Sequence, residues 1–240
     1  MLSSRARRMS QPMIVAIDGP AGAGKSTVAQ LIAEKLGYAY LDTGALYRAL
    51  AWKALAAGVD PASSTAMSQL CRSTRLTISP ANGDGFVVNV DGRALTTELR
   101  TPEVSRAASQ VAALPEVRAW LRPVQQAFGR QEGLRGVIAE GRDIGTHIFP
   151  GAAAKFFLEA EPGERAKRRQ QEQTRPGEPQ DLAQTRRELD ARDRRDRQRE
   201  SAPLTAAPDA TVIDTTQLSV EQVVERILAV IAEKAADRGR

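Results

Sequence analysis

The sequence predicts an α/β fold in which five short apolar strands form the core. The strands recur along the chain between stretches of helical periodicity, an alternation typical of a parallel sheet with crossover helices. One strand–helix junction is also rich in glycine, as in loops that bind phosphates. The five predicted strands are Met13–Ile17, Tyr38–Leu41, Gly136–Glu140, Ala153–Leu158 and Thr211–Asp214.

The first strand leads into the glycine-rich junction. After the junction, apolar residues recur with the spacing of one helix face, ending at Leu36. A strand, then the motif GxxxxGK followed by Ser, then a helix: this order predicts a phosphate-binding loop rather than a turn without a ligand. We call this segment the phosphate loop; it comprises Gly19, Pro20, Ala21, Gly22, Ala23, Gly24, Lys25, Ser26 and Thr27, all candidate ATP-binding residues.

The chemistry of phosphate binding accounts for these residue types. Glycines let several backbone N–H groups converge on phosphate oxygens, and the helix N-terminus adds its positive dipole end. Lys25 is expected to reach the β- and γ-phosphates of ATP. The Ser26 hydroxyl is expected to ligate Mg²⁺, the predicted cofactor.

Composition narrows the class of protein. The chain has 240 residues, of which 42% are hydrophobic and 26% charged, as in a globular protein. Aromatic residues make up only 4%, which argues against a protein that stacks single-stranded bases. The single cysteine, Cys71, fits a reducing cytoplasm, and no apolar run reaches the ~20 residues of a membrane span.

The N-terminal residues 1–12 contain Arg5, Arg7 and Arg8 and have no apolar h-region. We therefore expect no secretory signal here, but a disordered basic extension. The net charge of +5 suits small phosphates or nucleic acid, and the phosphate loop favours small phosphates. We expect nucleotides as partners, with no nucleic acid, no membrane and a monomeric state.

The second strand is followed by Asp42-Thr43-Gly44-Ala45-Leu46-Tyr47-Arg48, which opens a helix predicted to reach about Ala57. Open α/β sheets bind ligands at the carboxyl ends of their strands, and Tyr47 and Arg48 would lie at such an end. An ordinary surface helix explains the same residues equally well, so both interpretations stay open at this point.

Residues 70–100 have a different pattern and predict a small antiparallel insertion. Arg75–Ser79 and Phe86–Val90 alternate in polarity, and Asn82-Gly83-Asp84-Gly85 between them is a hairpin signal. A tight turn at Asp91-Gly92 predicts a third strand that ends at Leu95. Most of the insertion is expected to be scaffold.

Residues 101–131 are predicted to be helical, with a break near Pro115; Ser109 and Arg118 lie on this stretch. The third strand then ends at Gly141-Arg142-Asp143-Ile144-Gly145-Thr146, which we call the GRDIGT segment. An Arg-Asp pair between glycines at the carboxyl end of a strand indicates a binding site. His147 is interpreted as a turn or packing residue rather than a catalyst.

Helices are predicted at Glu164–Gln173 and at Asp181 to about Arg199, separated by a break at Arg175–Pro179. A final amphipathic helix is predicted from Val220 to about Lys234, capped by Ser219.

An arginine-rich stretch, Arg192-Asp193-Arg194-Arg195-Asp196-Arg197-Gln198-Arg199, lies on the second of these helices. At about 100° per residue, Arg192, Arg195, Asp196 and Arg199 share one face. One interpretation is an ordinary solvated helix with an Asp193–Arg197 pair, which would contribute ~0.2–0.5 kcal/mol to the stability of the helix. Three guanidinium groups on one face repel one another, which favours an anion-binding lid that closes over a transferring phosphoryl group and excludes water.

The phosphate loop, Asp42–Arg48, the GRDIGT segment and Arg192–Arg199, in this order, resemble the bacterial cytidylate kinase family. The resemblance extends from about Met13 to Lys234. It implies a three-layer P-loop NTPase fold with a five-stranded parallel sheet, a small antiparallel β insertion and a helical lid. The implied core comprises residues 13–69, 101–160 and 204–236, with a monophosphate-binding insertion at 70–100 and the lid at 161–203.

The resemblance also implies residue roles. Ser109, Arg118 and Asp143 would read cytosine, and Arg192 and Asp196 would contact the sugar. The CMP site would be completed by Thr43, Tyr47, Arg48, Arg142 and Arg199. Of these, Arg142 and Arg199 would contact the phosphate. Lys25, Arg142, Arg192 and Arg199 are the candidate catalytic residues, and Ser26 is the candidate metal ligand.

The function implied is transfer of the γ-phosphoryl group of ATP to CMP or dCMP. Cytosine presents an amino donor where uracil presents a carbonyl, so the carboxylate of Asp143 would favour cytosine. Two alternatives are a P-loop kinase for another small acceptor, such as shikimate, and a nucleotide-dependent switch or nucleic-acid-binding module. A screen of phosphoryl acceptors would distinguish a kinase for another acceptor from a cytidylate kinase. Salt-sensitive oligonucleotide binding without phosphotransfer would support the switch or nucleic-acid-binding module.

Overall fold

A parallel β-sheet forms the centre of the molecule. The computed structural model describes residues 12–80, 85–173 and 181–238, and within them one sheet has five strands in the order β2-β6-β1-β7-β8. Every neighbouring pair is parallel, and each predicted strand is confirmed to within one residue at each end. The bounds are β1 (Met13–Asp18), β2 (Ala39–Asp42), β6 (Gly136–Gly141), β7 (Ala154–Glu159) and β8 (Thr211–Asp214).

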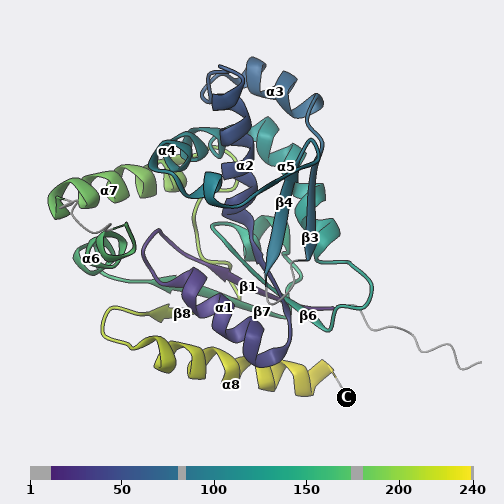
Figure 1. Cartoon of the computed structure of the whole chain (residues 1–240). Helices are drawn as coiled ribbons and strands as arrows, with labels where there is room; N and C mark the ends of the chain where they lie inside the picture. The colour runs from purple at the N-terminus through teal and green to yellow at the C-terminus, as the bar shows by residue number, and fades with distance from the viewer. Residues whose placement is uncertain (1–11, 81–84, 174–180, 239–240) are drawn as a thin grey trace, which may run out of the picture.

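One face of the sheet is covered by α1 (Lys25–Leu36) and α8 (Val220–Arg238) (Figure 1). Val15 and Ile17 of β1 point to this face and pack in one cluster with Ile32 of α1 and Ile227 of α8. The alternation of side chains along a strand sends the residue between them, Ala16, to the opposite face. The predicted cap of α8 is confirmed, because the backbone N–H of Gln222 donates to Ser219 Oγ at 3.3 Å.

The opposite face carries α5 (Pro115–Phe128) and a π-helical turn, Ile144–Ile148. Phe128, Ile144 and Ile148 pack there against Ala16 and Val137 of the sheet. Helices on both faces of a parallel sheet confirm the predicted three-layer α/β fold.

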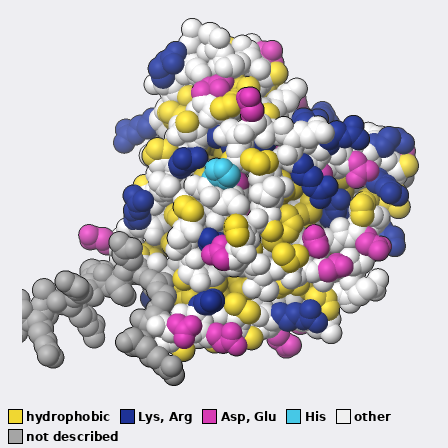
Figure 2. All heavy atoms as spheres, turned by 180° about the vertical axis from the view of Figure 1, so that it is seen from behind, with side chains coloured by type: hydrophobic (Ala, Val, Ile, Leu, Met, Phe, Trp, Pro, Cys, Tyr) yellow, Lys and Arg dark blue, Asp and Glu magenta, His cyan; other side chains and the backbone are white. Residues whose placement is uncertain are grey.

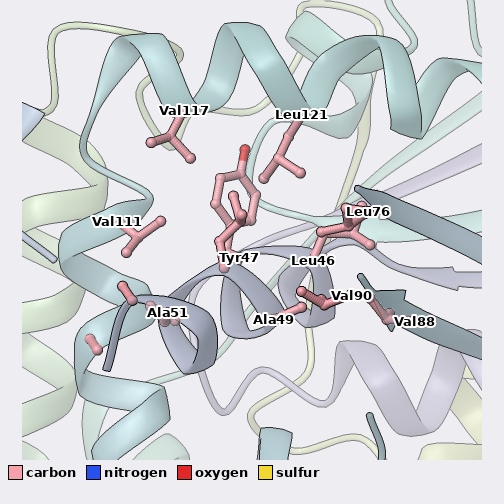
Figure 3. Close-up of a cluster of buried hydrophobic side chains, with 14 of the residues drawn as sticks. Leu46, Tyr47, Ala49, Ala51, Leu76, Val88, Val90, Val111, Val117 and Leu121 are labelled. Atoms are coloured by element: carbon pink, nitrogen blue, oxygen red, sulfur yellow. The ribbon is translucent and has the colours of Figure 1, made fainter. Parts of the chain in front are cut away.

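A second, antiparallel sheet joins β3 (Leu76–Pro80), β4 (Phe86–Val90) and β5 (Arg93–Leu95). The predicted insertion is therefore confirmed as β structure; most of its predicted hairpin turn lies outside the described residues. The sheet packs on α2 (Thr43–Ala56), α3 (Ser64–Arg72) and α4 (Pro102–Val111) around one hydrophobic cluster. Figure 3 shows the ring of Tyr47 rising from α2 toward α5, between Val117 and Leu121.

Helix α3 corrects one boundary. The sequence predicts that the β insertion begins at Leu70, but Leu70 lies inside α3. Met67, Leu70 and Cys71 are the buried residues of this helix, at the i, i+3 and i+4 positions of one face. The helix is short and polar on its other sides, so its pattern is weak in the sequence.

Two helices, α6 (Pro162–Gln173) and α7 (Leu182–Gln198), lie together at one end of the sheet (Figure 1). Both predicted helices are confirmed, and the predicted break at Arg175–Pro179 lies outside the described residues. Figure 2 shows Lys and Arg side chains gathered on the side of the molecule where α7 lies. None of the described helices combines the length and apolarity that crossing a membrane requires.

Candidate active site

A cleft of about 710 Å³ opens at the carboxyl ends of β1, β2 and β6. Its size is typical of a small-molecule site. The phosphate loop lines one part of it, and α2, α4, α5 and the GRDIGT segment line another, with α6 and α7 alongside. The cleft brings together all ten residues predicted to bind CMP: Thr43, Tyr47, Arg48, Ser109, Arg118, Arg142, Asp143, Arg192, Asp196 and Arg199.

The phosphate loop depends on glycine for its shape. Gly22 and Gly24 have φ angles of +76° and +85°, in the left-handed region that side chains disfavour. Helix α1 begins at Lys25, directly after Gly24, and no side chain caps it. The first N–H groups of the helix are therefore open toward the cleft, which is the arrangement that binds anions.

Six of the nine loop residues line the cleft: Ala21, Gly22, Gly24, Lys25, Ser26 and Thr27. The other three have structural positions. Gly19 passes so close to β7 that an added Cβ would lie 2.0 Å from the carbonyl oxygen of Leu158. Ala23 is fully buried beneath α1, and the carbonyl of Pro20 accepts a hydrogen bond from Lys25 Nζ at 2.6 Å.

Lys25 is buried among other cations. Burial and the nearby guanidinium of Arg142 lower the pKa of Lys25 to about 7. Glu140 counteracts this effect, and Arg192 adds to it. Burial and Arg142 likewise lower the pKa of Arg192 to about 10. The cations at this point of the cleft thus repel one another, and an anion placed among them would relieve the repulsion.

Glu140 is a site residue that the sequence analysis missed. It stands near the carboxyl end of β6, beside Ile17 of β1, and accepts a hydrogen bond from the Tyr40 hydroxyl. Burial raises the pKa of Glu140, and Asp42 adds to this effect, while Lys25 and hydrogen bonds from Tyr40 and Ser26 oppose it. A carboxylate at the end of an otherwise apolar strand was the available signal.

Asp18 was missed in the same way. It is the last residue of β1 and is buried. Its carboxylate accepts hydrogen bonds from the backbone N–H groups of Ile144 and Gly145, both at 2.8 Å. Burial raises the pKa of Asp18 to about 6, although the two backbone hydrogen bonds act to lower it. Asp18 therefore joins the start of the phosphate loop to the GRDIGT segment.

A buried ion pair lies at the other end of the cleft. Arg118 of α5 donates from Nη2 to the carboxylate of Asp143, and both side chains are almost fully buried. Arg118 also donates from Nη1 to the carbonyl of Ala112 at 3.1 Å and lies 5.5 Å from the ring centroid of Tyr47. The planar guanidinium is thus fixed from three sides, which suits it to hydrogen-bonding a flat ligand.

Helix α7 is connected to the GRDIGT segment by further ion pairs. Arg142 Nε lies 3.1 Å from the carboxylate of Asp196, and Arg199 lies 3.6 Å from Asp143 and 3.7 Å from Asp196. Burial acts to raise the pKa of Asp196, but Arg142, Arg192 and Arg199 together hold it below its ordinary value. The carboxylate of Asp196 is consequently available as an acceptor in the cleft.

Three other predicted residues have protein partners of their own. Arg48 pairs with the carboxylate of Asp42, which also caps α2 by accepting from the N–H of Ala45 at 3.2 Å. Thr43 Oγ1 donates to the carbonyl of Glu140 at 2.8 Å. Ser109 Oγ accepts from Nε of Arg195 at 3.2 Å, a contact that links α4 to α7 across the cleft.

One pair from the alternative interpretation of α7 does not form. A solvated helix would have placed Asp193 at the surface, paired with Arg197. The structure buries Asp193 and pairs its carboxylate with Arg165 of α6, while Arg197 stays exposed. The i, i+4 spacing cannot reveal such a partner, because Arg165 is 28 residues away in the sequence.

Known proteins match the chain along most of its length. The family model described as cytidylate kinase matches residues 15–233. The cytidylate kinase of Geobacillus kaustophilus (strain HTA426) is 49% identical over 94% of this chain and 99% of that protein. The cytidylate kinase of Desulfitobacterium hafniense (strain Y51) is 44% identical over 94% of this chain and 95% of that protein.

A third relative carries the matching region as part of a longer protein. The bifunctional pantoate ligase/cytidylate kinase of Synechococcus sp. (strain JA-3-3Ab) is 45% identical over 92% of this chain but only 41% of that protein. With matches of this extent and identity, and with the four predicted motifs gathered around one cleft, the chain belongs to the cytidylate kinase family.

Proposed function

We propose that the protein transfers the γ-phosphoryl group of ATP to CMP or dCMP, giving ADP and CDP or dCDP. The observation that carries this proposal is the single cleft that has the phosphate loop in one part and the buried Arg118–Asp143 pair in another. A donor triphosphate and an acceptor monophosphate can meet there without leaving the protein. Family membership supports the same pair of substrates.

The donor end would hold ATP through the phosphate loop, Gly19–Thr27. Backbone N–H groups and the N-terminus of α1 would bind the β- and γ-phosphates, with Lys25 beside them. A phosphate there would meet a buried cluster of cations, in which burial and then repulsion by Arg142 lower the pKa of Lys25. Each negative charge would therefore be stabilised strongly.

The site also fits Mg²⁺. The Ser26 hydroxyl and the Glu140 carboxylate are oxygen ligands of the kind Mg²⁺ prefers, and both line the cleft near Lys25. Bound with ATP, the ion would neutralise charge on the β- and γ-phosphates. Ser26 is the ligand expected from the sequence, and Glu140 is the one that we add.

The acceptor end would read the base. Asp143 would accept from the exocyclic amino group of cytosine, and Arg118 and Ser109 would donate to the ring acceptors. Uracil would turn a carbonyl toward Asp143, so two acceptors would face each other and the carboxylate would lack the donor that cytosine supplies. Sites built on such hydrogen bonds can discriminate by ~10⁴–10⁵. The pyrimidine would lie against the ring of Tyr47, next to Thr43.

The sugar and the acceptor phosphate would lie between these two ends. Arg192 and Asp196 would contact the sugar, and Arg48, Arg142 and Arg199 would bind the phosphate. Arg142 and Arg192 line the same cleft as Lys25, so they would act on the transferring group as well. The α6–α7 pair would close over the reactants as a lid and exclude water, a competing acceptor.

The reaction would need alignment more than proton transfer. The attacking oxygen of the acceptor phosphate is already anionic at neutral pH, so no general base is required. Lys25, Arg142, Arg192 and Arg199 would neutralise the charge that spreads over the phosphoryl oxygens as the bond to ADP breaks. Holding both phosphates in line in one cleft would supply the rest of the rate acceleration.

A coupled assay of ADP formation with ATP and a panel of acceptors tests the proposal. We expect CMP and dCMP to be phosphorylated well, UMP poorly, and AMP, GMP and shikimate not at all. Efficient turnover of another acceptor, or no CDP from folded protein, would contradict it. Oligonucleotide binding that weakens with salt, in the absence of phosphotransfer, would instead favour a nucleic-acid-binding function.

A further inference from the structure

A second buried ion pair lies behind the phosphate loop, outside the cleft. Arg165 of α6 and Asp193 of α7 are 5% and 4% exposed, and their side chains pair directly. Arg165 Nη1 also donates to the carbonyl of Ala21 in the phosphate loop at 3.1 Å, and Nε donates to the carbonyl of Ala160 at 3.0 Å. One guanidinium thus holds the loop, the end of β7 and α7 together.

The loop is packed against the same two helices. A Cβ at Gly22 would lie 2.7 Å from the carbonyl oxygen of Arg165, so only glycine lets the loop approach α6 this closely. Ala21, Ala166 and Leu189 form a small buried apolar cluster of loop, α6 and α7. The tip of the loop cannot shift far without disturbing α6 or α7.

The geometry points to a positioning role for this pair. A trans peptide group is planar, and its C=O and N–H point in opposite directions. Arg165 holds the carbonyl of Ala21 on the side away from the cleft, so the N–H of the same peptide group, on Gly22, faces the other way. Gly22 lines the cleft, where phosphate N–H donors are needed.

We propose that Arg165 and Asp193 position the Ala21–Gly22 peptide group for the phosphates of ATP and fix α7 to the same point. This proposal rests on the proposed function above. Asp193 directly follows Arg192 on α7, and Asp196 comes one turn later. A shift of Asp193 would therefore displace Arg192 and Asp196, the proposed sugar contacts, as well as the phosphate loop.

The pair depends on both of its members. Arg165 donates to Oδ2 of Asp193, and Oδ1 is buried with no hydrogen-bond partner among the described residues, so that carboxylate depends on Arg165 for its compensation. A buried charge that loses its partner is strongly unfavourable, and neighbouring groups move to bring in water or another charge. Removing either member should therefore disturb the loop even though neither member lines the cleft.

The variants Asp193→Asn and Arg165→Lys test this role. Asparagine keeps the shape of aspartate without its charge, and lysine keeps the charge of arginine without its planar fork. We expect the Kd for ADP and the KM for ATP to rise on the order of tenfold and kcat to fall by a similar factor, because misplaced phosphate contacts lose binding and alignment. The KM for CMP should change by less than about threefold, since the Arg118–Asp143 end is untouched.

Asp190→Asn is the matched control. Asp190 lies on α7, one turn before Asp193, and its pair with Arg186 is exposed. The control should leave all four constants within about twofold, as expected for a surface pair. If Asp193→Asn and Arg165→Lys lower the thermal unfolding temperature but match Asp190→Asn in every constant, the pair is only structural and the proposal is wrong.

ADP binding, measured by calorimetry, separates this proposal from the proposed function. If the protein makes no CDP but the two variants still weaken ADP binding, the proposed acceptor is wrong and the positioning role stands. If CDP is made and ADP binding is unchanged in both folded variants, the positioning role is wrong and the proposed function stands.

Discussion

The carboxylate of Asp18 accepts two hydrogen bonds of 2.8 Å: Oδ1 accepts from the backbone N–H of Ile144, and Oδ2 accepts from the N–H of Gly145. Asp18 immediately precedes the phosphate loop, and Ile144 immediately follows Asp143 in the GRDIGT segment. The proposed donor and acceptor ends are therefore connected by one carboxylate. Its two hydrogen bonds fix the distance between β1 and the segment that carries Arg142.

Asp18 should also make stability depend on pH. Burial raises the pKa of Asp18 from 3.8 to about 6, so the folded state binds this proton more tightly than the unfolded state. Between these two values the contribution of Asp18 to the free energy of unfolding falls as pH rises. The variant Asp18→Asn lacks this group, so the difference, wild type minus variant, should decrease from pH 4 to pH 6 and stay constant above it.

Urea unfolding at half-unit steps from pH 4 to pH 7 measures that difference. A difference that increases with pH would mean that the hydrogen bonds from Ile144 and Gly145 outweigh burial and that the pKa of Asp18 is lowered instead. A flat difference would mean that the carboxylate titrates alike in both states.

Lys25 should be needed for catalysis and not for folding. The variant Lys25→Met removes a cation proposed to stabilise the transferring phosphoryl group, so we expect kcat to fall by on the order of 10²–10³. Burial and Arg142 lower the pKa of Lys25, which means that its charge is unfavourable in the protein alone. The thermal unfolding temperature should therefore stay the same or rise.

Lys35→Met, on an exposed position of the same helix, is the matched control and should change neither quantity. A large loss of thermal stability in Lys25→Met, with kcat reduced only in proportion to unfolded protein, would assign Lys25 a structural role.

ATP binding should be accompanied by proton uptake above neutral pH. With a pKa of about 7, Lys25 is mostly neutral at pH 8. The negative charge of the bound phosphates favours the ammonium form and raises the pKa, so close to one proton should be taken up at pH 8 and much less at pH 6. Calorimetry in two buffers with different ionisation enthalpies counts these protons, and Lys25→Met should abolish the difference between the two pH values.

The local parts of this structure were predictable from the sequence. An apolar strand followed by glycines, Lys25 and Ser26 has one common structural solution, and the strands are too apolar to lie elsewhere than in the core. Residues defined by distant partners were not predictable. In the sequence Asp193 has Arg197 as its local candidate partner, but in the fold it pairs with Arg165 from another helix. Asp18 and Glu140 are single charges in apolar strands, and their partners come from other elements.

The preference for cytosine should depend on Asp143. The variant Asp143→Asn keeps an acceptor oxygen but adds an amide donor and removes the charge that pairs with Arg118. An amide can turn its NH₂ group toward the carbonyl of uracil, so we expect kcat/KM for CMP to fall by about 10²–10³ and that for UMP to change far less. The Kd for ADP should stay within about threefold, because the phosphate loop is not altered.

These constants can be measured with the same coupled assay, using CMP, dCMP and UMP as acceptors. CMP and dCMP should be affected equally, because they differ only at the sugar, which Asp143 is not proposed to contact. Equal losses for CMP, UMP and ADP binding would show that the variant disturbs the cleft as a whole through the unpaired Arg118 guanidinium. In that outcome the buried pair would hold the cleft together, and the choice of base would have to be made by Ser109 and its partner Arg195.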